Sequence, residues 1–502
     1  MWPFAKRQSA PIEQAGDRPA PTPTGRTIGR RLRGYAAAAV NRLTNDWRAG
    51  HTTANLEIAR ALPMLRNRAR DLERNNDYIR RYLHLLCTNV VGHAGIGLQM
   101  RVKTARGLDD KRANDAIEAA WKEWSADCAV DGQHSWLDVQ HVALRTVARD
   151  GELLLRIPPS WKGNRFGMAV QLLEADHLDV DYSEQLRDGG EVIMGVEYDR
   201  WRRPVAYHLF DQHPGENVNY ATRQTRRRVP AAEIIHLRRP ERIGEARSVP
   251  WVTCAAPRLR QIAAAEEAEV VAWRIAASKM GFYSPSIDAP EDFEGDDEAA
   301  DGTPISEVQP GLLEKLPRGW TFQGFNPDKP ASTVGSFLKA ELRGIASGLN
   351  VSYVALANDL EGVSYSSIRS GENADRDHWR VLQSWLIQHL CRPVFERWLE
   401  RSLLTAAIAH DPADFDRLNR PIWRPRGWEW VDPSNESAAA EADVRLGVES
   451  LYSIAAKRGH DLEEVFAANQ QARELAASYG IPLPVFEPKE AAKKQPEEPT
   501  DA

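Results

Sequence analysis

The first hydrophobic pattern in the chain is helical. From Thr53 to about Val91, apolar residues recur every three or four positions among arginines and asparagines, which predicts an amphipathic helix. The residues that set this spacing are Leu62, Leu65, Leu72, Ile79, Leu83 and Leu86. Gly92 begins a glycine-containing stretch that is expected to end the helix before a short strand.

After two further helical stretches the pattern changes to short runs. Helices are expected at 114–124 and 136–149, and the first is expected to bury Trp121 and Trp124. Beyond Gly151, four apolar or alternating runs are separated by Gly, Pro, Asn and Asp, which predicts strands. Helices followed by a series of strands indicate the α+β class.

Residues 251–280 form the clearest helical stretch, yet its apolar stripe is thin. Alanine dominates the interior, and the larger apolar residues are few. They are Leu259, Ile262, Val270 and Trp273. Three acids, Glu266, Glu267 and Glu269, lie on or near one side. The pattern leaves two alternatives open: the helix packs on neighbouring copies of itself, or it is an ordinary surface helix.

The second half of the chain is mostly helical after a proline-rich interval. Residues 281–332 hold seven prolines, an acidic run and two candidate strands, GFYSPSI and GWTFQGFN; the acidic run lacks the spacing of a calcium loop. A helix is expected at 333–357, with Gly348 and Asn350 as candidate stops. A polar loop and a long helix from Ser367 to about Ala407, kinked at Pro393, follow. Short amphipathic helices are expected at 436–447, 451–458 and 461–479.

Composition describes a folded protein without a strong basic excess. Hydrophobic residues make up 42%, charged residues 27%, and the formal net charge is -6. Tight binding to nucleic acid usually requires a positive excess, so any such role is expected to be passage or loose contact, or to use a local patch. The four cysteines are far apart and are expected to be reduced, buried thiols. Neither a signal peptide nor a membrane span is expected.

Signatures of catalysis are sparse. The sequence contains no Walker A motif, no HExxH and no GxSxG. His236, within an apolar run, is expected to be structural. Glu174 and Asp176 alternate on a presumed strand and could hold magnesium in a nuclease, which is the alternative function. We predict no resident metal and no cofactor.

Five blocks in a fixed order give the chain its resemblance to the lambda-type phage portal proteins, over about residues 30–480. The blocks are residues 229–251, the helix and strand that follow from Pro257, VQPGLLEKLPRGWTFQGFNPDKP, residues 342–371 and residues 426–447. The most specific element is Tyr365, Ser366, Ser367 and Arg369. The sequence departs from the family pattern at Ser364, where Asn is frequent, and at Ser434-Asn435, where a basic residue is commoner.

This resemblance implies an α+β portal fold that assembles into a ring, usually a dodecamer, and is not an enzyme. It implies the following division: 1–30 flexible arm, 31–250 wing, 251–280 first stem helix, 281–332 clip, 333–357 second stem helix, 358–366 tunnel loop, 367–420 long wing helix, 421–485 helical crown and 486–502 disordered tail. The ring would be the channel for double-stranded DNA during packaging and ejection.

The same resemblance assigns roles to individual residues and partners. Glu266, Glu267 and Glu269 would line the channel and keep DNA centred by repulsion. Lys339 and Arg343 would contact phosphates, although solvated positions or ion pairs with the acids opposite are equally compatible with the pattern. The tunnel-loop residues would be Asn358, Asp359, Glu361, Ser364 and Tyr365.

The partners implied are terminase, a head-tail adaptor, and the major capsid and scaffold proteins, without a membrane. The protein would be assembled in the host cytoplasm and located at a vertex of the virion. A different ring-forming capsid component, such as an adaptor, is the further alternative, but those chains are usually shorter and lack the stem-clip-stem order.

Overall fold

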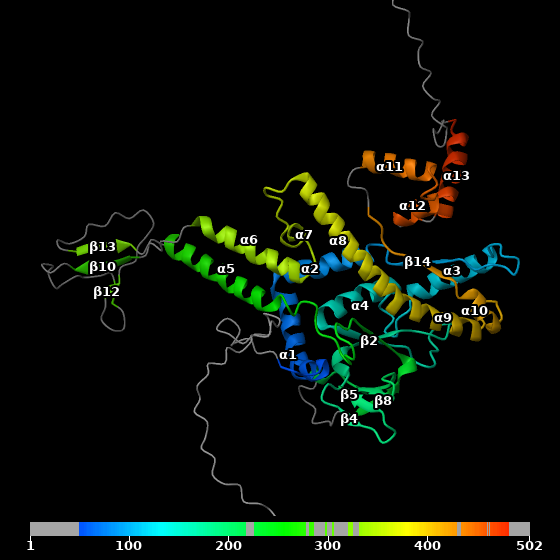
Figure 1. Ribbon diagram of the computed structural model, residues 1–502, viewed down its shortest axis with the longest axis horizontal. Helices are drawn as coiled ribbons and strands as arrows, with labels where there is room; N and C mark the ends of the chain where they lie inside the picture. The colour runs from blue at the N-terminus through cyan, green and yellow to red at the C-terminus, as the bar shows by residue number, and fades with distance from the viewer. Residues whose placement is uncertain are drawn as a thin grey trace, which may run out of the picture. The chain divides into compact units, whose positions relative to one another are not determined.

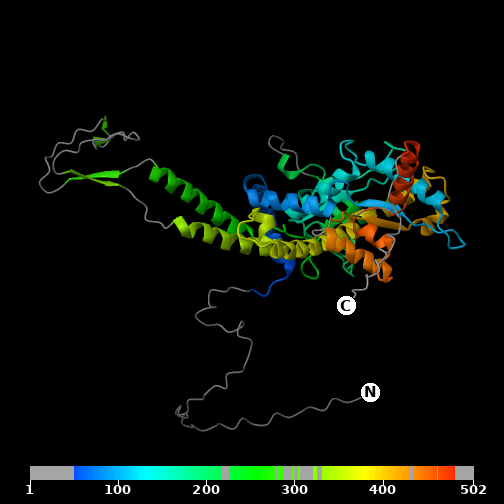
Figure 2. The same ribbon diagram turned by 90° about the horizontal axis from the view of Figure 1, so that it is seen from above.

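The structure is a computed structural model, and it describes residues 50–216, 225–277, 281–285, 297–298, 304–305, 320–324, 331–428, 433–458, 460 and 462–480. Figures 1 and 2 show its helices and strands in two views. The expected arm at 1–30, the tail at 486–502 and most of the 281–332 interval lie outside the described residues. None of the described helices is both long and apolar enough to cross a membrane.

Four helices open the described chain, and polar caps set where they begin. They are α1 (Ala54–Asn75), α2 (Asp77–Leu86), α3 (Lys111–Ala126) and α4 (Trp136–Asp150). Asn76 separates α1 from α2, where a single helix was expected, because its side chain accepts a hydrogen bond from the backbone N–H of Ile79 and starts a new helix. Ser135 and Asp138 form a capping box at the start of α4. The π-helical turn Cys87–Val91 ends α2 before Gly92.

Two antiparallel sheets carry most of the strands between residues 152 and 238. The first has the order β3-β2-β9, from Gln171–Glu174, Glu152–Arg156 and Ile234–Arg238. The second has the order β4-β5-β6-β7-β8, from Glu184–Gln185, Glu191–Ile193, Val196–Tyr198, Pro204–Phe210 and Arg226–Pro230. In the first, Leu154 pairs with Leu173 and His236. The predicted α+β class is confirmed by these sheets among helices.

Helices α5 (Ala256–Ala277) and α6 (Ala331–Gly348) lie side by side in both views (Figures 1 and 2). The predicted helix at 251–280 is therefore present but begins at residue 256. Between the two helices, β10 (Gly281–Pro285) pairs antiparallel with β13 (Trp320–Gly324), and β11 (Asp297–Glu298) with β12 (Pro304–Ile305). Both strands predicted in this interval are thus observed.

The expected helix at 333–357 is two helices. Helix α6 ends at Gly348, Asn350 takes a positive φ of 54°, and α7 (Tyr353–Ala357) begins after the cap Ser352. The left-handed backbone at Asn350 cannot continue a helix, which is the physical reason for the break.

The long helix predicted from Ser367 to Ala407 is also divided. It consists of α8 (Tyr365–Leu386), a π-helical turn at Ile387–Cys391, and α9 (Arg392–Leu404). Pro393 stands in the first turn of α9, where its missing N–H costs nothing. In place of a kink at the proline, the π-helical turn Ile387–Cys391 precedes it. In a regular helix the proline ring would clash with the carbonyl four residues earlier, and the wider turn avoids this clash.

The C-terminal part is helical, as predicted. After α10 (Phe415–Leu418), strand β14 (Pro421–Arg424) pairs antiparallel with β1 (Gly97–Met100). Three helices follow: α11 (Pro433–Arg445), α12 (Leu451–Lys457) and α13 (Leu462–Ser478). Arg101 lies over the ring of Tyr452 at 5.6 Å and links the segment after β1 to α12.

The main hydrophobic core joins α3, α4 and α9 through aromatic side chains. Trp121 contacts Trp124, Trp136, Phe395 and Trp398, with ring centroids between 4.9 and 5.6 Å apart. Trp121 and Trp124 are buried as predicted. The thiol prediction is correct for Cys128 and Cys391 and wrong for Cys254, which is exposed beside the carbonyl of Gly348.

Candidate functional site

Among the described residues, helix α5 is buried in the core through its N-terminal half. Leu259 and Ile262 are fully buried in the main core, whereas the large side chains nearer its C-terminus are exposed: Val270 by 50%, Val271 by 44% and Trp273 by 66%. Helix α6 covers one side of it, and at their crossing the guanidinium of Arg258 occupies the space beside Gly344. The described contacts therefore leave a long apolar surface on α5 uncovered.

The three acids of α5 have different surroundings. Glu266 is half-buried and accepts a hydrogen bond from the hydroxyl of Tyr78 in α2, at 3.2 Å. Burial and the neighbouring Glu266 carboxylate raise the pKa of Tyr78 to about 12. Glu267 is exposed and Glu269 half-buried. Thus Glu267 faces solvent in the single chain, while Glu266 is already engaged in holding α5 against α2.

Lys339 in α6 is paired with acids of the loop that follows α7. Its ammonium lies 3.2 Å from Asp359 and 3.0 Å from Glu361. These ion pairs raise the pKa of Lys339, Glu361 contributing first and Asp359 second. An ion pair between Lys339 and acids opposite it was one of the predicted alternatives, but Asp359 and Glu361 were not identified as its partners. They lie about twenty residues after Lys339, and only the folding of the loop brings them close to it.

Arg343 lies one helical turn after Lys339 and has a different contact. Its guanidinium carbon lies 5.5 Å from the ring centroid of Tyr353, the first residue of α7. A cation over an aromatic face attracts it electrostatically. The two basic residues thus both hold α6 to the segment that follows it.

Asp359 is the centre of the loop. It accepts a hydrogen bond from the Tyr353 hydroxyl at 2.7 Å and from the backbone N–H of Glu361 at 2.9 Å. These two bonds, followed by the Lys339 pair, lower the pKa of Asp359 to about 2. Asn358 precedes it with a positive φ of 53°, which ends α7 and turns the chain. The loop therefore has one defined arrangement.

Ser364 closes the loop by starting the next helix. Its hydroxyl accepts a hydrogen bond from the backbone N–H of Ser367 at 3.3 Å, which makes it the N-cap of α8. Tyr365 is the first residue of α8. Ser364 departs from the Asn that the family often has, and either side chain can cap a helix in this way.

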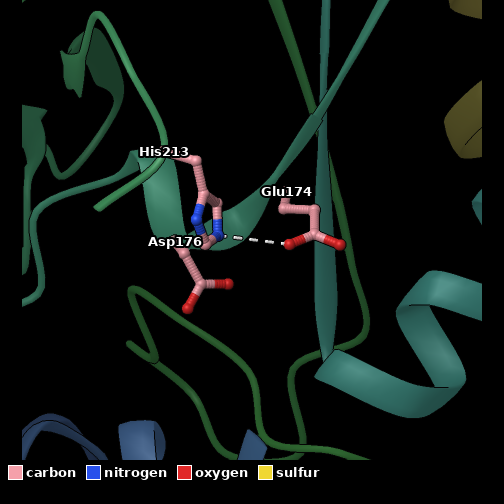
Figure 3. A group of neighbouring side chains, drawn as sticks. All are labelled: Glu174, Asp176 and His213. Atoms are coloured by element: carbon pink, nitrogen blue, oxygen red, sulfur yellow. Dashed lines mark ion pairs between the residues drawn. The ribbon is translucent and has the colours of Figure 1, made fainter. Parts of the chain in front are cut away.

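Glu174 and Asp176, the acids of the alternative nuclease site, do not share one strand. Strand β3 ends at Glu174, and Asp176 lies in the 3₁₀ turn Ala175–His177, in which Ala175 is buried. Figure 3 shows the two acids beside His213, and one possible ligand atom of each lies within 4.8 Å of the others. His213 was not predicted from the sequence to lie near these acids.

Arginines already neutralise this cluster. Arg70 lies 2.5 Å from Asp176 and 3.5 Å from Glu174, and Arg149 lies 3.5 Å from Glu174. Burial would raise the pKa of Asp176, but the bond from Arg70 and the nearby positive charges lower it. Guanidinium groups already pair with both carboxylates, and His213 lies 3.2 Å from Glu174, so in this structure the cluster is an ion-pair network.

A fully buried carboxylate was not identified from the sequence. Glu152, the first residue of β2, is fully buried and contacts Arg66, Arg247 at 2.5 Å and His236 at 2.8 Å. Arg247, also fully buried, donates to the carbonyl oxygens of Ala175, at 2.9 Å, and of Leu178 and Met194. His236 has the structural environment that was predicted for it.

Comparison with known proteins gives a consistent family. The family model described as phage portal protein, lambda family, matches residues 40–383. A probable portal protein of Halomonas phage phiHAP-1 is 35% identical over 96% of this chain and 92% of its own length. Portal protein B of Escherichia phage lambda is 22% identical, covering 81% of this chain and 82% of the relative.

A solved structure gives a weaker likeness. A chain from the neck of a native gene transfer agent particle, computed with C12 symmetry, has a TM-score of 0.41 and 12% identity, and the match covers 78% of this chain and 92% of that one.

Proposed function

Because this chain belongs to the lambda family of phage portal proteins, we propose that it assembles into a ring around a channel for double-stranded DNA. In this ring α5 and α6 are the stem helices, and the pair lines the channel. Twelve copies is the expected number. The ring stands at one vertex of the capsid and is built in the cytoplasm of the bacterial host.

The uncovered surface of α5 is the observation that carries this proposal. A helix whose Val270 and Trp273 are half or more exposed does not bury enough apolar area to be stable as a lone projection. Neighbouring copies in a ring would cover these side chains from the flank that α6 leaves open. This favours packing against copies over the ordinary surface helix, the two alternatives that the pattern left open.

The nearly balanced charge of the two stem helices supports passage of DNA through the ring. Helices α5 and α6 together hold four acids and five basic residues, Glu267 is exposed, and the chain as a whole carries a formal net charge of -6. A wall without a basic excess does not hold phosphates at fixed points, whereas a strongly basic wall would bind them in a salt-dependent way. Lys339 is paired with Asp359 and Glu361. In this arrangement it holds the loop to α6 and is not free to contact a phosphate.

The partners follow from the proposed position of the ring. The 281–332 interval would contact terminase during packaging and a head-tail adaptor afterwards, and the wing, 31–250 with 367–420, would contact the capsid and scaffold proteins. The loop 358–366 would project toward DNA, and the helices of 421–485 would form the crown. The family is one of structural proteins, and neither the family match nor the arginine-filled acidic cluster supports the nuclease alternative.

Light scattering of the purified chain, with a stem variant, tests the assembly. The native chain is expected to form a species of many copies, and the double variant Val270→Asp/Trp273→Asp is expected to remain monomeric with unchanged circular dichroism. The control Leu108→Asp changes an equally exposed side chain in another turn (69% exposed) and should assemble normally. Assembly of the stem variant like the native chain would refute the role given to α5.

A further inference from the structure

Two neighbouring loops expose the large apolar side chains Trp201 and Ile243 although their backbones are firmly held. Trp201 is 71% exposed in the turn between β6 and β7, and Ile243 is fully exposed in the loop after β9. Both loops belong to the region of the five-stranded sheet, whose strands β4, β5 and β8 are labelled in Figure 1. The proposed stem and ring do not use either residue.

Asp199 fixes the first loop. Its carboxylate accepts hydrogen bonds from the backbone N–H groups of Trp201 and Arg203, each at 2.8 Å. Its own backbone N–H donates to the carbonyl of Arg203 at 3.0 Å. The turn therefore presents Trp201 to solvent in one backbone conformation.

Arg202 stands in a strained position within this turn. Its φ is +60°, in the left-handed region where glycine or asparagine is usual. The side chain is anchored by Glu191 at 2.8 Å. Strain of this kind persists where surrounding contacts enforce it, and it concentrates at binding sites.

The second loop is fixed from two sides and touches the first. Asn55 donates to the carbonyl of Gly244 at 2.9 Å, and the Glu245 carboxylate accepts from the backbone N–H groups of Glu241 and Arg242 at 2.9 and 3.0 Å. A Cβ at Gly244 would lie 3.5 Å from the Arg202 guanidinium, so the loops adjoin there. Trp201 and Ile243 each stand one residue from this contact.

The charges at the first loop are positive. The turn 199–203 contains three arginines and one acid. Arg202 is neutralised by Glu191, whereas in the described part of the chain Arg200 and Arg203 meet no carboxylate; Arg200 instead lies 5.3 Å from the Trp201 ring centroid. In the second loop Glu241 is exposed, and Arg242 lies 3.3 Å from Glu57 of α1.

From this geometry we infer that the two loops form a docking site for an acidic segment of a partner protein, one that carries a large apolar side chain between or beside its carboxylates. The apolar side chain packs on Trp201 and Ile243, and the carboxylates pair with Arg200 and Arg203. Tryptophan and arginine are enriched among the residues that dominate protein interfaces. A backbone that is already fixed loses little further conformational entropy when a partner binds.

Peptide binding tests this site directly. The probes are twelve-residue peptides that tile the other proteins encoded by the same virus, presented to the full native chain. Peptides that combine several Asp or Glu residues with one large apolar residue are expected to bind, and Trp201→Ala or Arg200→Glu/Arg203→Glu is expected to weaken them about tenfold or more.

Matched variants and a second ligand make the test decisive. Leu108→Ser and Arg187→Glu remove an exposed apolar and an exposed basic side chain from other turns and should leave peptide binding unchanged. Failure of every acidic peptide to bind, or equal binding by all variants, would overturn the inference. The inference would also be overturned if no peptide bound while a short DNA duplex did, and if the Trp201 and arginine variants abolished the binding of that duplex. Because the site lies outside the stem, none of these outcomes depends on ring assembly.

Discussion

Glu152 is a fully buried carboxylate whose partners come from widely separated parts of the chain. Arg66 belongs to α1, His236 to β9 and Arg247 to the segment before α5. Burial alone would raise the pKa of Glu152, but Arg247 and Arg66 hold it well below its usual range. This network fixes α1 and both sheets to one another.

Removal of Arg247 should therefore destabilise the fold around Glu152. Arg247→Met leaves Glu152 with less compensation and also removes the guanidinium donor from the carbonyl oxygens of Ala175 and Met194. We expect a loss of about 3–5 kcal/mol in the free energy of unfolding, measured by urea denaturation.

The control is an exposed ion pair of the same type. Arg165 pairs with Glu123, and both side chains are about half exposed. Arg165→Met should cost less than about 1 kcal/mol. Equal losses for the two variants would contradict the role given to the buried network.

The same network makes the free energy of unfolding depend on pH in the acidic range. Burial lowers the pKa of His236 to about 4, and the folded pKa of Glu152 is also lowered. Both groups bind protons more readily in the unfolded state than in the folded state. Their contribution to stability is therefore fully present above the unfolded pKa of His236, about 6.5, and is lost as the pH falls toward 4.

For His236 alone this loss is on the order of 3 kcal/mol. Urea titrations of the native chain and of His236→Gln at several pH values measure it. The variant should show a shallower dependence between pH 6.5 and 4, and identical slopes would refute the assignment.

At this scale the sequence predicted little beyond individual environments. Burial of Trp121 and Trp124 and the structural role of His236 followed from local apolar context. The pairing of Glu152 with Arg247 did not, because the two residues are brought together only by the packing of β2 against the segment that leads to α5, and no local spacing encodes that contact.

Among the elements, the junction between α4 and β2 depends on one glycine. Gly151 has a φ of +92°, and a Cβ there would overlap the backbone carbonyl of Ser248. Gly151→Ala should destabilise the protein by about 3 kcal/mol or more, since strain and overlap add. Thermal unfolding measures the effect.

Gly189 supplies the matched control. Its φ is +84°, and a Cβ there meets nothing within 4 Å. Gly189→Ala should cost only about 1 kcal/mol. If Gly151→Ala were no worse than this, the close approach of the two backbones would not be limiting.

The link between α6 and the loop 358–364 should respond to a single charge. Lys339→Met removes both ion pairs and leaves Asp359 with its Tyr353 and backbone donors. We expect several-fold faster hydrogen exchange in residues 358–364, and a similar effect of high salt on the native chain, because exposed pairs are screened. Exchange unchanged in the variant would show that the pairs do not hold the loop.

Periodicity predicted the existence of the elements better than their limits. The helices at α5, α8 and α9, the strands β10 and β13, and the stop at Gly348 and Asn350 were expected. The breaks at Asn76 and Ile387 were not placed correctly. At Asn76 a capping side chain interrupts an apolar pattern that continues unchanged, and at Ile387 a wider turn precedes Pro393.

For the whole molecule, the fold class and the family could be predicted because several motifs agree in order along most of the chain. The candidate site could be predicted only in part. Which flank of α5 is covered by another copy, and which acids face DNA, are properties of an assembly, and a single chain does not encode them in its own contacts.

Electron cryo-microscopy of the assembled protein would show directly whether the chain forms the proposed ring. We expect a closed ring in which α5 and α6 of every copy surround the central hole, Val270 and Trp273 are buried between copies, and Glu267 faces the lumen. A closed dimer, or a ring whose hole is lined by other elements while α5 stays exposed on the outside, would contradict it.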